Sequence, residues 1–250
     1  MAGALAGKAP GPDYGLDSPA LVHDWWHRAG WFVAIGVGVW FINHQEYPGV
    51  SARLFAVMGS LGLLSAGVAS YKIQSSRQGK LRLRDQLLDQ LALQGDEKVL
   101  DAGCGLGLMS IGAAKRLKTG KVTAIDTWSP QDLSGNSVEA ARENAKAEGV
   151  AERIRFEAGN PSKLLYPGGQ YDVVVSVMAL HRLDDDNQRE QALREMLRVL
   201  RPGGRLLVFD TTETGYYAGV LRTSGAQDVQ LSPWTFLWCR PGRGVSARKP

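Results

Sequence analysis

A glycine-rich stretch, DAGCGLG at residues 101–107, lies between a short apolar run and a segment with helical periodicity. Glycines at a strand-to-helix turn allow the backbone to approach a ligand closely. Asp126 ends the next apolar run, 19 residues beyond Gly107. An acid at that place can accept hydrogen bonds from the hydroxyls of a ribose. The two features together predict a binding site for a cofactor that contains a nucleoside.

Two classes of cofactor use this arrangement. A dinucleotide site requires GxGxxG, whereas this chain has GxGxG followed by Leu108 and Met109, so the third glycine of the motif is missing. Asp101 would also repel a pyrophosphate, but it suits a cofactor that has a cationic amino-acid end. The residues therefore disfavour a nicotinamide-dependent oxidoreductase, which is kept as an alternative function.

The segments around this stretch alternate between strand and helix patterns. Such alternation predicts a parallel sheet with helices on both faces. We therefore predict an α/β fold with a doubly wound, mostly parallel, seven-stranded sheet and an N-terminal helical hairpin. The strands are predicted at residues 98–103, 121–126, 153–159, 171–178, 205–210, 228–232 and 244–249. Helices are predicted at 109–117, 136–149, about 187–200 and 215–224, with a further short helix around residues 87–93.

Several stretches in order resemble the motifs of the class I S-adenosylmethionine-dependent methyltransferases, over about residues 80–250. They are DAGCGLG, AIDTWS at 124–129, EAGNPS at 157–162, YDVVVSVMALHRL at 171–183 and LRVLRPGGRLLVFD at 197–210. Together these motifs are highly specific, although each alone is weak. The stretches IGAAKRLKTGK, DLSGNS and YGLDSP (residues 14–19) also look like those of a poorly characterised bacterial branch with an N-terminal hydrophobic segment.

The resemblance implies S-adenosylmethionine as the cofactor and gives its residues roles. The loop glycines would border the methionine end, Asp101 would lie near its ammonium, and Asp126 would bind the ribose. Trp128 could lie against the adenine or pack in the core, and Asn160 stands where the family usually has an aspartate that contacts the adenine amino group. The predicted cofactor-binding residues are Asp101, Gly103, Cys104, Gly105, Gly107, Asp126, Thr127, Trp128, Asn160 and Ser176, the last of them near the transferred methyl.

His181 follows the fourth predicted strand, where the family often faces its substrate. It could remove a proton from a hydroxyl or phenol, or it could simply pack at the strand end. Asp132, Ser134 and Asn136 could line the entrance to the site, although Asn136 is an equally good helix N-cap. The acids at 184–186 resemble a metal cluster, but they precede a helix, where capping is the favoured interpretation. We predict no metal site, and two cysteines, Cys104 and Cys239, predict no disulfide framework.

Two apolar runs occupy the N-terminal third, at residues 29–42 and 54–71, with a short polar loop between them. A membrane-spanning helix needs about 20 apolar residues, so the second run qualifies and the first is short. Five basic residues and no acid follow within residues 72–84, and by the positive-inside rule this flank remains in the cytoplasm. We expect a membrane hairpin that anchors a cytoplasmic catalytic domain; a substrate lid on a soluble cytoplasmic protein is the alternative.

The predicted division is an N-terminal segment (1–28), the hairpin (29–71), a basic linker (72–84) and the methyltransferase domain (85–250). The net charge is +4, but residues 1–84 hold eight Lys and Arg against four acids, whereas residues 85–250 hold 21 of each. A nucleic-acid-binding face on the main domain is therefore not indicated. The expected acceptor is a hydrophobic small molecule such as a lipid, a quinone or a polyketide-like compound. A catalytically inactive cofactor-binding membrane protein is the non-enzyme alternative.

Overall fold

The computed structural model describes residues 11–17, 19–129, 135–237 and 240–250. The chain forms two compact units: one joins the residues up to Gly15 with Lys80–Pro250, and the other is Leu16–Gly79. These boundaries differ from the expected ones. The residues expected to form a basic linker are helical, because they end one helix, form a π-helical turn (Ser75–Gly79) and begin the next helix.

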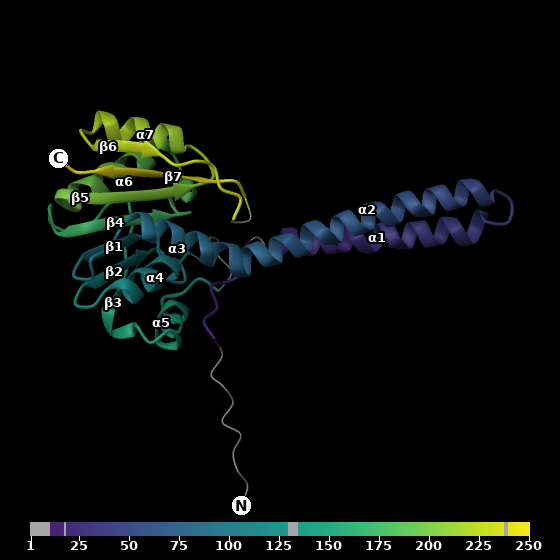
Figure 1. The fold of residues 1–250 in the computed structure, drawn as a ribbon, viewed down its shortest axis with the longest axis horizontal. Helices are drawn as coiled ribbons and strands as arrows, with labels where there is room; N and C mark the ends of the chain where they lie inside the picture. Colours follow the sequence, from purple (N-terminus) through teal and green to yellow (C-terminus); the bar gives the residue numbers. More distant parts are fainter. Residues whose placement is uncertain (1–10, 18, 130–134, 238–239) are drawn as a thin grey trace, which may run out of the picture. The chain divides into compact units, whose positions relative to one another are not determined.

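The smaller unit is a hairpin of two long helices, α1 (Pro19–Asn43) and α2 (Pro48–Gln74) (Figure 1). Small residues lie where the helices meet. A Cβ atom added at Gly36 would lie 3.0 Å from the Cβ of Met58, and one at Gly62 would lie 3.1 Å from a methyl of Val33. The close approach of the helices therefore depends on small side chains, which are Ala29, Gly36, Ser51, Gly62, Ser65 and Ala69.

Large apolar side chains cover the outside of this hairpin. Phe41, Ile42 and Leu63 are 73%, 79% and 77% exposed. The helical stretch Pro48–Gln90 is long and apolar enough to cross a membrane, and 17% of its most apolar window is buried. Length and composition alone are weak grounds for a membrane span. The smaller unit thus places small and hydroxyl-bearing residues inside and apolar residues outside, the reverse of a water-soluble helix pair.

The larger unit is built on a sheet of seven strands in the order β3-β2-β1-β4-β5-β7-β6. The first five strands are parallel, and β7 is antiparallel to both β5 and β6. This confirms the predicted seven-stranded, mostly parallel sheet. The strands are β1 (Lys98–Ala102), β2 (Lys121–Asp126), β3 (Ile154–Ala158), β4 (Tyr171–Val177), β5 (Leu200–Asp210), β6 (Gln227–Leu231) and β7 (Arg243–Arg248).

Helices cover both faces of the sheet (Figure 1). Val173 and Val175 of β4 pack on one side in a cluster that includes residues of α3, α4 and α5, and Val174 packs on the other side in a cluster that includes residues of α6 and α7. The alternation explains why β4 is apolar along its length. The helices are α3 (Lys80–Gln90), α4 (Leu108–Arg116), α5 (Val138–Ala147), α6 (Asp186–Val199) and α7 (Thr214–Thr223).

The carboxyl ends of the five parallel strands meet at one edge of the sheet, because parallel strands run in the same direction. Asp126 ends β2 and Asp210 ends β5 at this edge. The antiparallel pairing of Asp210 with Arg243 brings the connection between β6 and β7 to the same edge. This is the edge at which ligands bind in open α/β sheets, and it receives the glycine-rich stretch.

Candidate active site

The glycine-rich loop is fixed to the neighbouring strand by its backbone. The N–H groups of Gly103 and Cys104 both donate to the carbonyl oxygen of Ile125, at 2.8 and 3.0 Å. Gly103 has a φ of +88°, and a Cβ atom there would lie 2.2 Å from the Cβ of Ala179. No side chain fits at Gly103, so the glycine is required by both its conformation and its contact with the segment after β4.

Asp126 holds the loop from the other side. One carboxylate oxygen accepts the N–H of Gly105 at 2.8 Å, and the other accepts the N–H of Trp128 at 2.7 Å. The residue is 8% exposed and lines a cavity. Because each carboxylate oxygen can accept more than one hydrogen bond, Asp126 retains acceptor capacity for hydroxyl groups of a ligand.

The cavity beside Asp126 has a volume of about 380 Å³. It brings together four of the predicted residues, namely Gly103, Asp126, Thr127 and Asn160. Met178, which sequence reasoning missed, also lines it and has a φ of +58°, a strained value for a residue with a side chain. The remaining lining residues are Ser129, Pro161, Ala179, Arg182, Leu183, Asp184 and Gln188.

Asp101 lies beneath the loop and is fully buried. The hydroxyl of Ser110 donates to one carboxylate oxygen at 2.5 Å, and the other oxygen has no hydrogen-bond partner among the described residues. Burial raises the pKa of Asp101 to about 7, and the charge of Asp126 adds to this shift. A buried carboxylate oxygen without a donor fits a cationic ligand group, because such a group would satisfy the oxygen and favour its charge.

Other predicted residues support the loop without lining the cavity. The indole N–H of Trp128 donates to the carbonyl of Gly105 at 3.2 Å, and the ring packs against the core. Cys104 is buried, and burial raises the pKa of its thiol, so the side chain stays neutral. The hydroxyl of Ser176 donates to the carbonyl of Ala102 at 2.8 Å inside the sheet. The hydroxyl of Ser176 therefore links β4 to β1.

Asn160 occupies the turn after β3. Its side-chain oxygen accepts hydrogen bonds from the N–H and the hydroxyl of Ser162, both at 2.9 Å. The amide oxygen expected to face an adenine amino group is thus already engaged by its own turn. Asn160 still lines the cavity through its position.

His181 pairs with an acid that sequence reasoning missed. Its Nδ1 lies 2.8 Å from Oδ1 of Asp210, and its backbone N–H donates to Oδ2 at 3.1 Å. Asp210 is fully buried, and its charge adds to the effect of burial in raising the pKa of the Tyr217 hydroxyl. Asp210 could have been found from the sequence, because it ends the predicted strand RLLVFD just as Asp126 ends the strand KVTAID.

The acids at 184–186 begin α6, as expected. Asp185 is the N-cap residue and accepts the N–H of Gln188 at 2.7 Å. No group of three or more potential metal ligands occurs in the part of the chain that the structure describes. Asp185 thus caps α6 and Asp186 lies in its first turn, whereas Asp184 lines the cavity.

Asn136 is not the N-cap of α5, which is Ser137. Its side-chain amide instead donates to the carbonyl of Ser129 at 3.3 Å. The predicted entrance residues Asp132 and Ser134 lie outside the described residues, as does Cys239.

The raised pKa of Asp101 predicts a pH dependence of stability. Between the ordinary pKa of 3.8 and about 7, the folded state binds a proton that the unfolded state has released, so the free energy of unfolding falls as the pH rises through this window. Asp101→Asn lacks this titrating group. From pH 5 to pH 8 we therefore expect the free energy of unfolding to fall more in the wild type than in the variant. Parallel denaturation profiles for the two proteins would contradict this prediction.

Comparisons with known proteins agree with this geometry. Residues 99–204 match the family described as a methyltransferase domain. The chain is 34% identical over 134 residues to the methyltransferase GfsG of Streptomyces halstedii, covering 54% of this chain and 45% of that protein. It is 32% identical over 131 residues to the demethylmenaquinone methyltransferase of Lactiplantibacillus plantarum, covering 52% of each. The chain thus spans about half the length of the curated relatives it matches.

Solved structures share the fold. An S-adenosylmethionine-dependent methyltransferase from Aquifex aeolicus superposes with a TM-score of 0.55 at 20% identity, covering 73% of this chain and 98% of that one. The geranyl diphosphate methyltransferase in complex with its cofactor gives a TM-score of 0.54 at 15% identity, covering 72% and 88%. Residues 99–204 are thus similar to a methyltransferase domain in sequence, and the larger unit shares its fold with S-adenosylmethionine-dependent methyltransferases.

Proposed function

We propose that this protein transfers a methyl group from S-adenosylmethionine to a hydrophobic small molecule. The observation that carries the proposal is Asp126, which lines the cavity, holds the glycine-rich loop through the N–H of Gly105, and keeps capacity for ribose hydroxyls. The missing third glycine of the dinucleotide motif continues to disfavour a nicotinamide cofactor.

The residues around the cavity fit the parts of this cofactor. In the proposed complex Asp126 would bind the ribose, and Asp101, which is buried beneath the loop and does not line the cavity, would face the ammonium of the methionine end with its partnerless oxygen. Gly103 leaves room for close approach to the backbone, while Thr127 and Asn160 contribute polar groups to the lining. The cofactor supplies a methyl group already activated on a sulfonium. The task left to the protein is to hold donor and acceptor in line and to exclude water.

The first test is calorimetric titration of the full chain with S-adenosylhomocysteine. We expect Asp126→Ala to raise the Kd by about 100-fold, because it removes charged acceptors from the ribose and from the N–H of Gly105. Asp228→Ala is the matched control, since Asp228 is an exposed acid on β6 that pairs with Arg248. Absence of binding to the intact protein would rule out the proposed function.

His181 is the proposed general base. Nδ1 lies 2.8 Å from Oδ1 of Asp210, although the angle is not that of a hydrogen bond. In the tautomer with the proton on Nδ1, Nε2 is free to accept a proton. If a hydroxyl acceptor were bound beside the ring, Nε2 of His181 would take its proton as the hydroxyl oxygen accepted the methyl group. The cofactor, when bound, would supply that methyl group from its sulfonium and leave as a neutral thioether. The buried carboxylate of Asp210 supports this role, because it lies beside the ring and holds the backbone of His181 through the N–H.

We expect His181→Ala to lower kcat by about 100-fold to 10,000-fold with a hydroxyl acceptor. The Kd for S-adenosylhomocysteine should stay within about twofold of the wild type, since His181 does not line the cofactor cavity. Single-turnover methylation assays and calorimetry measure the two quantities. An unchanged kcat would remove His181 from the mechanism and leave positioning of the acceptor as the source of catalysis.

The acceptor is proposed to be apolar and of low molecular weight. Two relatives are named for a quinone and for an antibiotic, namely the demethylmenaquinone methyltransferase and the 27-O-demethylrifamycin SV methyltransferase of Amycolatopsis mediterranei. Trp234 and Phe236 are exposed between β6 and β7, at the edge of the sheet that carries the cavity. The guanidinium of Arg243 lies 4.8 Å from the ring centre of Trp234 and fixes it. These rings offer a surface for an apolar acceptor.

The helical hairpin is proposed to anchor the protein in a membrane. The 25 residues of α1 and 27 residues of α2 correspond to about 37 and 40 Å, which exceeds the roughly 30 Å of a hydrocarbon core. Small residues between the helices and apolar residues outside them support lipid as the surrounding medium. The basic flank at 72–84 favours a cytoplasmic location for both ends of the hairpin.

Cysteine labelling in intact cells tests the anchor. In a Cys104→Ser, Cys239→Ser background, Gln45→Cys lies in the turn between α1 and α2, and Asp228→Cys marks the larger unit. We expect an impermeant maleimide to label position 45 from outside the cytoplasmic membrane, and position 228 only after lysis. Labelling of both positions only after lysis, with release of the protein by alkaline carbonate, would favour the lid.

A further inference from the structure

A strap formed by residues 11–15 belongs to the larger unit although about 65 residues separate it from the rest of that unit. It contains the start of YGLDSP, a stretch that the proposed methyl transfer does not use. Asn144 of α5 fixes it through the backbone of Asp13: the N–H of Asp13 donates to the amide oxygen of Asn144, and the amide nitrogen donates to the carbonyl of Asp13, both at 2.8 Å.

The same side chain reaches the glycine-rich loop. The amide nitrogen of Asn144 also donates to the carbonyl of Leu106 at 3.0 Å. Leu106 lies between Gly105, whose N–H is held by Asp126, and Gly107. Asn144 is 5% exposed, so its three hydrogen bonds are made away from water. One buried amide therefore joins the strap to the loop.

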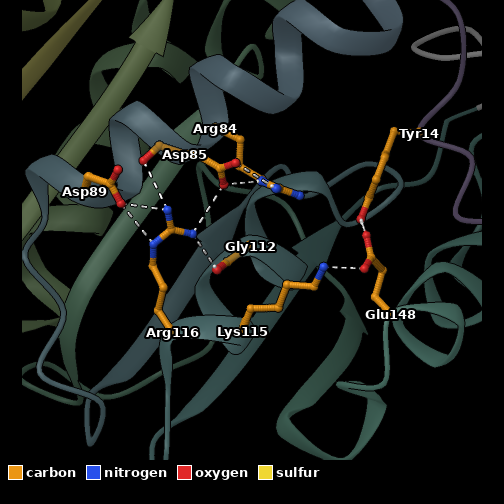
Figure 2. A network of polar contacts seen from close by, with 8 residues as sticks. All are labelled: Tyr14, Arg84, Asp85, Asp89, Gly112, Lys115, Arg116 and Glu148. Carbon is orange, nitrogen blue, oxygen red and sulfur yellow. Dashed lines mark hydrogen bonds and ion pairs between the residues drawn. The ribbon is translucent and has the colours of Figure 1, made fainter.

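Tyr14 seats the strap in the core. Its side chain is 7% exposed and belongs to the hydrophobic cluster of α3, α4 and α5. Figure 2 shows its hydroxyl beside Glu148, to which it donates at 3.3 Å, and Lys115 of α4 pairs with the same carboxylate. Burial raises the pKa of Tyr14, and Glu148 adds to this shift, so the hydroxyl remains a donor.

Neighbouring contacts keep the helices under the strap in place. In Figure 2, Arg116 of α4 extends toward Asp85 and Asp89 of α3, and one of its nitrogens lies 2.7 Å from Asp89. The ammonium of Lys80, which is 3% exposed, donates to the carbonyls of Tyr14 and Gly15 at 2.8 and 2.6 Å. The strap is thus held by the backbone of Asp13, by the ring of Tyr14 and by the carbonyls of Tyr14 and Gly15.

We infer that the strap is a working part of the cofactor site, and that Asn144 is a positioning residue that sets the shape of the glycine-rich loop through the carbonyl of Leu106. The inference rests on the proposed function, because it assumes that this loop binds S-adenosylmethionine. Without Asn144, the buried carbonyl of Leu106 loses a donor, and the loop loses a support additional to that from Asp126.

Thermodynamic linkage makes the coupling reciprocal. If an ordered strap strengthens cofactor binding, then cofactor binding must order the strap by the same factor. Hydrogen exchange at two amides reports the ordering of the strap. The amide of Asp13 donates to Asn144, and the amide of Gly15 donates to the carboxylate of Asp13 at 2.9 Å. The acceptors of these two hydrogen bonds, Asn144 and Asp13, do not line the cavity.

The first measurement is hydrogen exchange of the unmodified protein with and without saturating S-adenosylhomocysteine. We expect exchange in the peptide that contains residues 11–15 to slow by about fivefold or more when the ligand is bound. This measurement needs no variant, so it holds even where a substitution prevents folding. Binding of the ligand with no change in that peptide would overturn the inference.

The second measurement is calorimetry on variants of α5. We expect Asn144→Ala and Asn144→Asp to raise the Kd for S-adenosylhomocysteine by about fivefold or more, because both remove the donor to Leu106. Ser137→Ala is the matched control. It removes the N-cap hydrogen bond from the N–H of Ala140 in the same helix and lowers the stability of α5, and it should leave the Kd within about twofold.

The outcomes separate the two hypotheses. An intact protein that does not bind S-adenosylhomocysteine contradicts the proposed function itself. An intact protein that binds, with Asn144→Ala equal to the wild type, contradicts only the role of the strap. An equal loss of affinity in Asn144→Ala and Ser137→Ala would assign the effect to the stability of α5 and would also overturn the positioning role.

Discussion

The carboxylate of Asp126 is the interaction on which the site depends. It ends β2 and accepts one backbone N–H from the glycine-rich loop and one from the segment after its own strand. A carboxylate that accepts two backbone N–H groups is held in a fixed orientation. The loop, the cavity and the segment that carries Trp128 therefore share one support, and the parallel sheet matters because it brings the ends of β1 and β2 to the same place.

A second constraint is the cost of burying acids. Asp101 and Asp210 are both buried at carboxyl ends of strands, but their surroundings differ. Asp101 has one donor, Ser110, and an oxygen without a partner, whereas Asp210 receives the N–H groups of His181 and Thr211 and the imidazole of His181. One oxygen of the first acid is left without a donor among the described residues, whereas both oxygens of the second have neighbouring donors. This difference is the basis for proposing a binding role for Asp101 and an orienting role for Asp210.

The sequence was sufficient for the sheet, the glycine-rich loop and Asp126, because apolar periodicity and glycine spacing are local signals. It could not show that Asn144 joins Asp13 to Leu106, since these residues are far apart in the chain and a buried amide has no pattern of its own. Nothing in the sequence indicated that the hydroxyl of Ser176, predicted to lie near the methyl group, donates to the carbonyl of Ala102. Hydropathy also could not show that the strap belongs to the larger unit, because it marks only the apolar runs that follow the strap.

The contacts of Lys80 suggest how the helical hairpin could have been inserted into the chain. Its ammonium bonds the carbonyls of Tyr14 and Gly15, so the points where the chain leaves and rejoins the larger unit are neighbours. The helical hairpin is therefore topologically an insertion, and neighbouring ends are the condition under which insertions are tolerated. A truncated protein that begins at α3 would lose Tyr14 together with the hairpin. Joining Gly15 to Lys80 through a short linker would remove the hairpin and retain a complete larger unit.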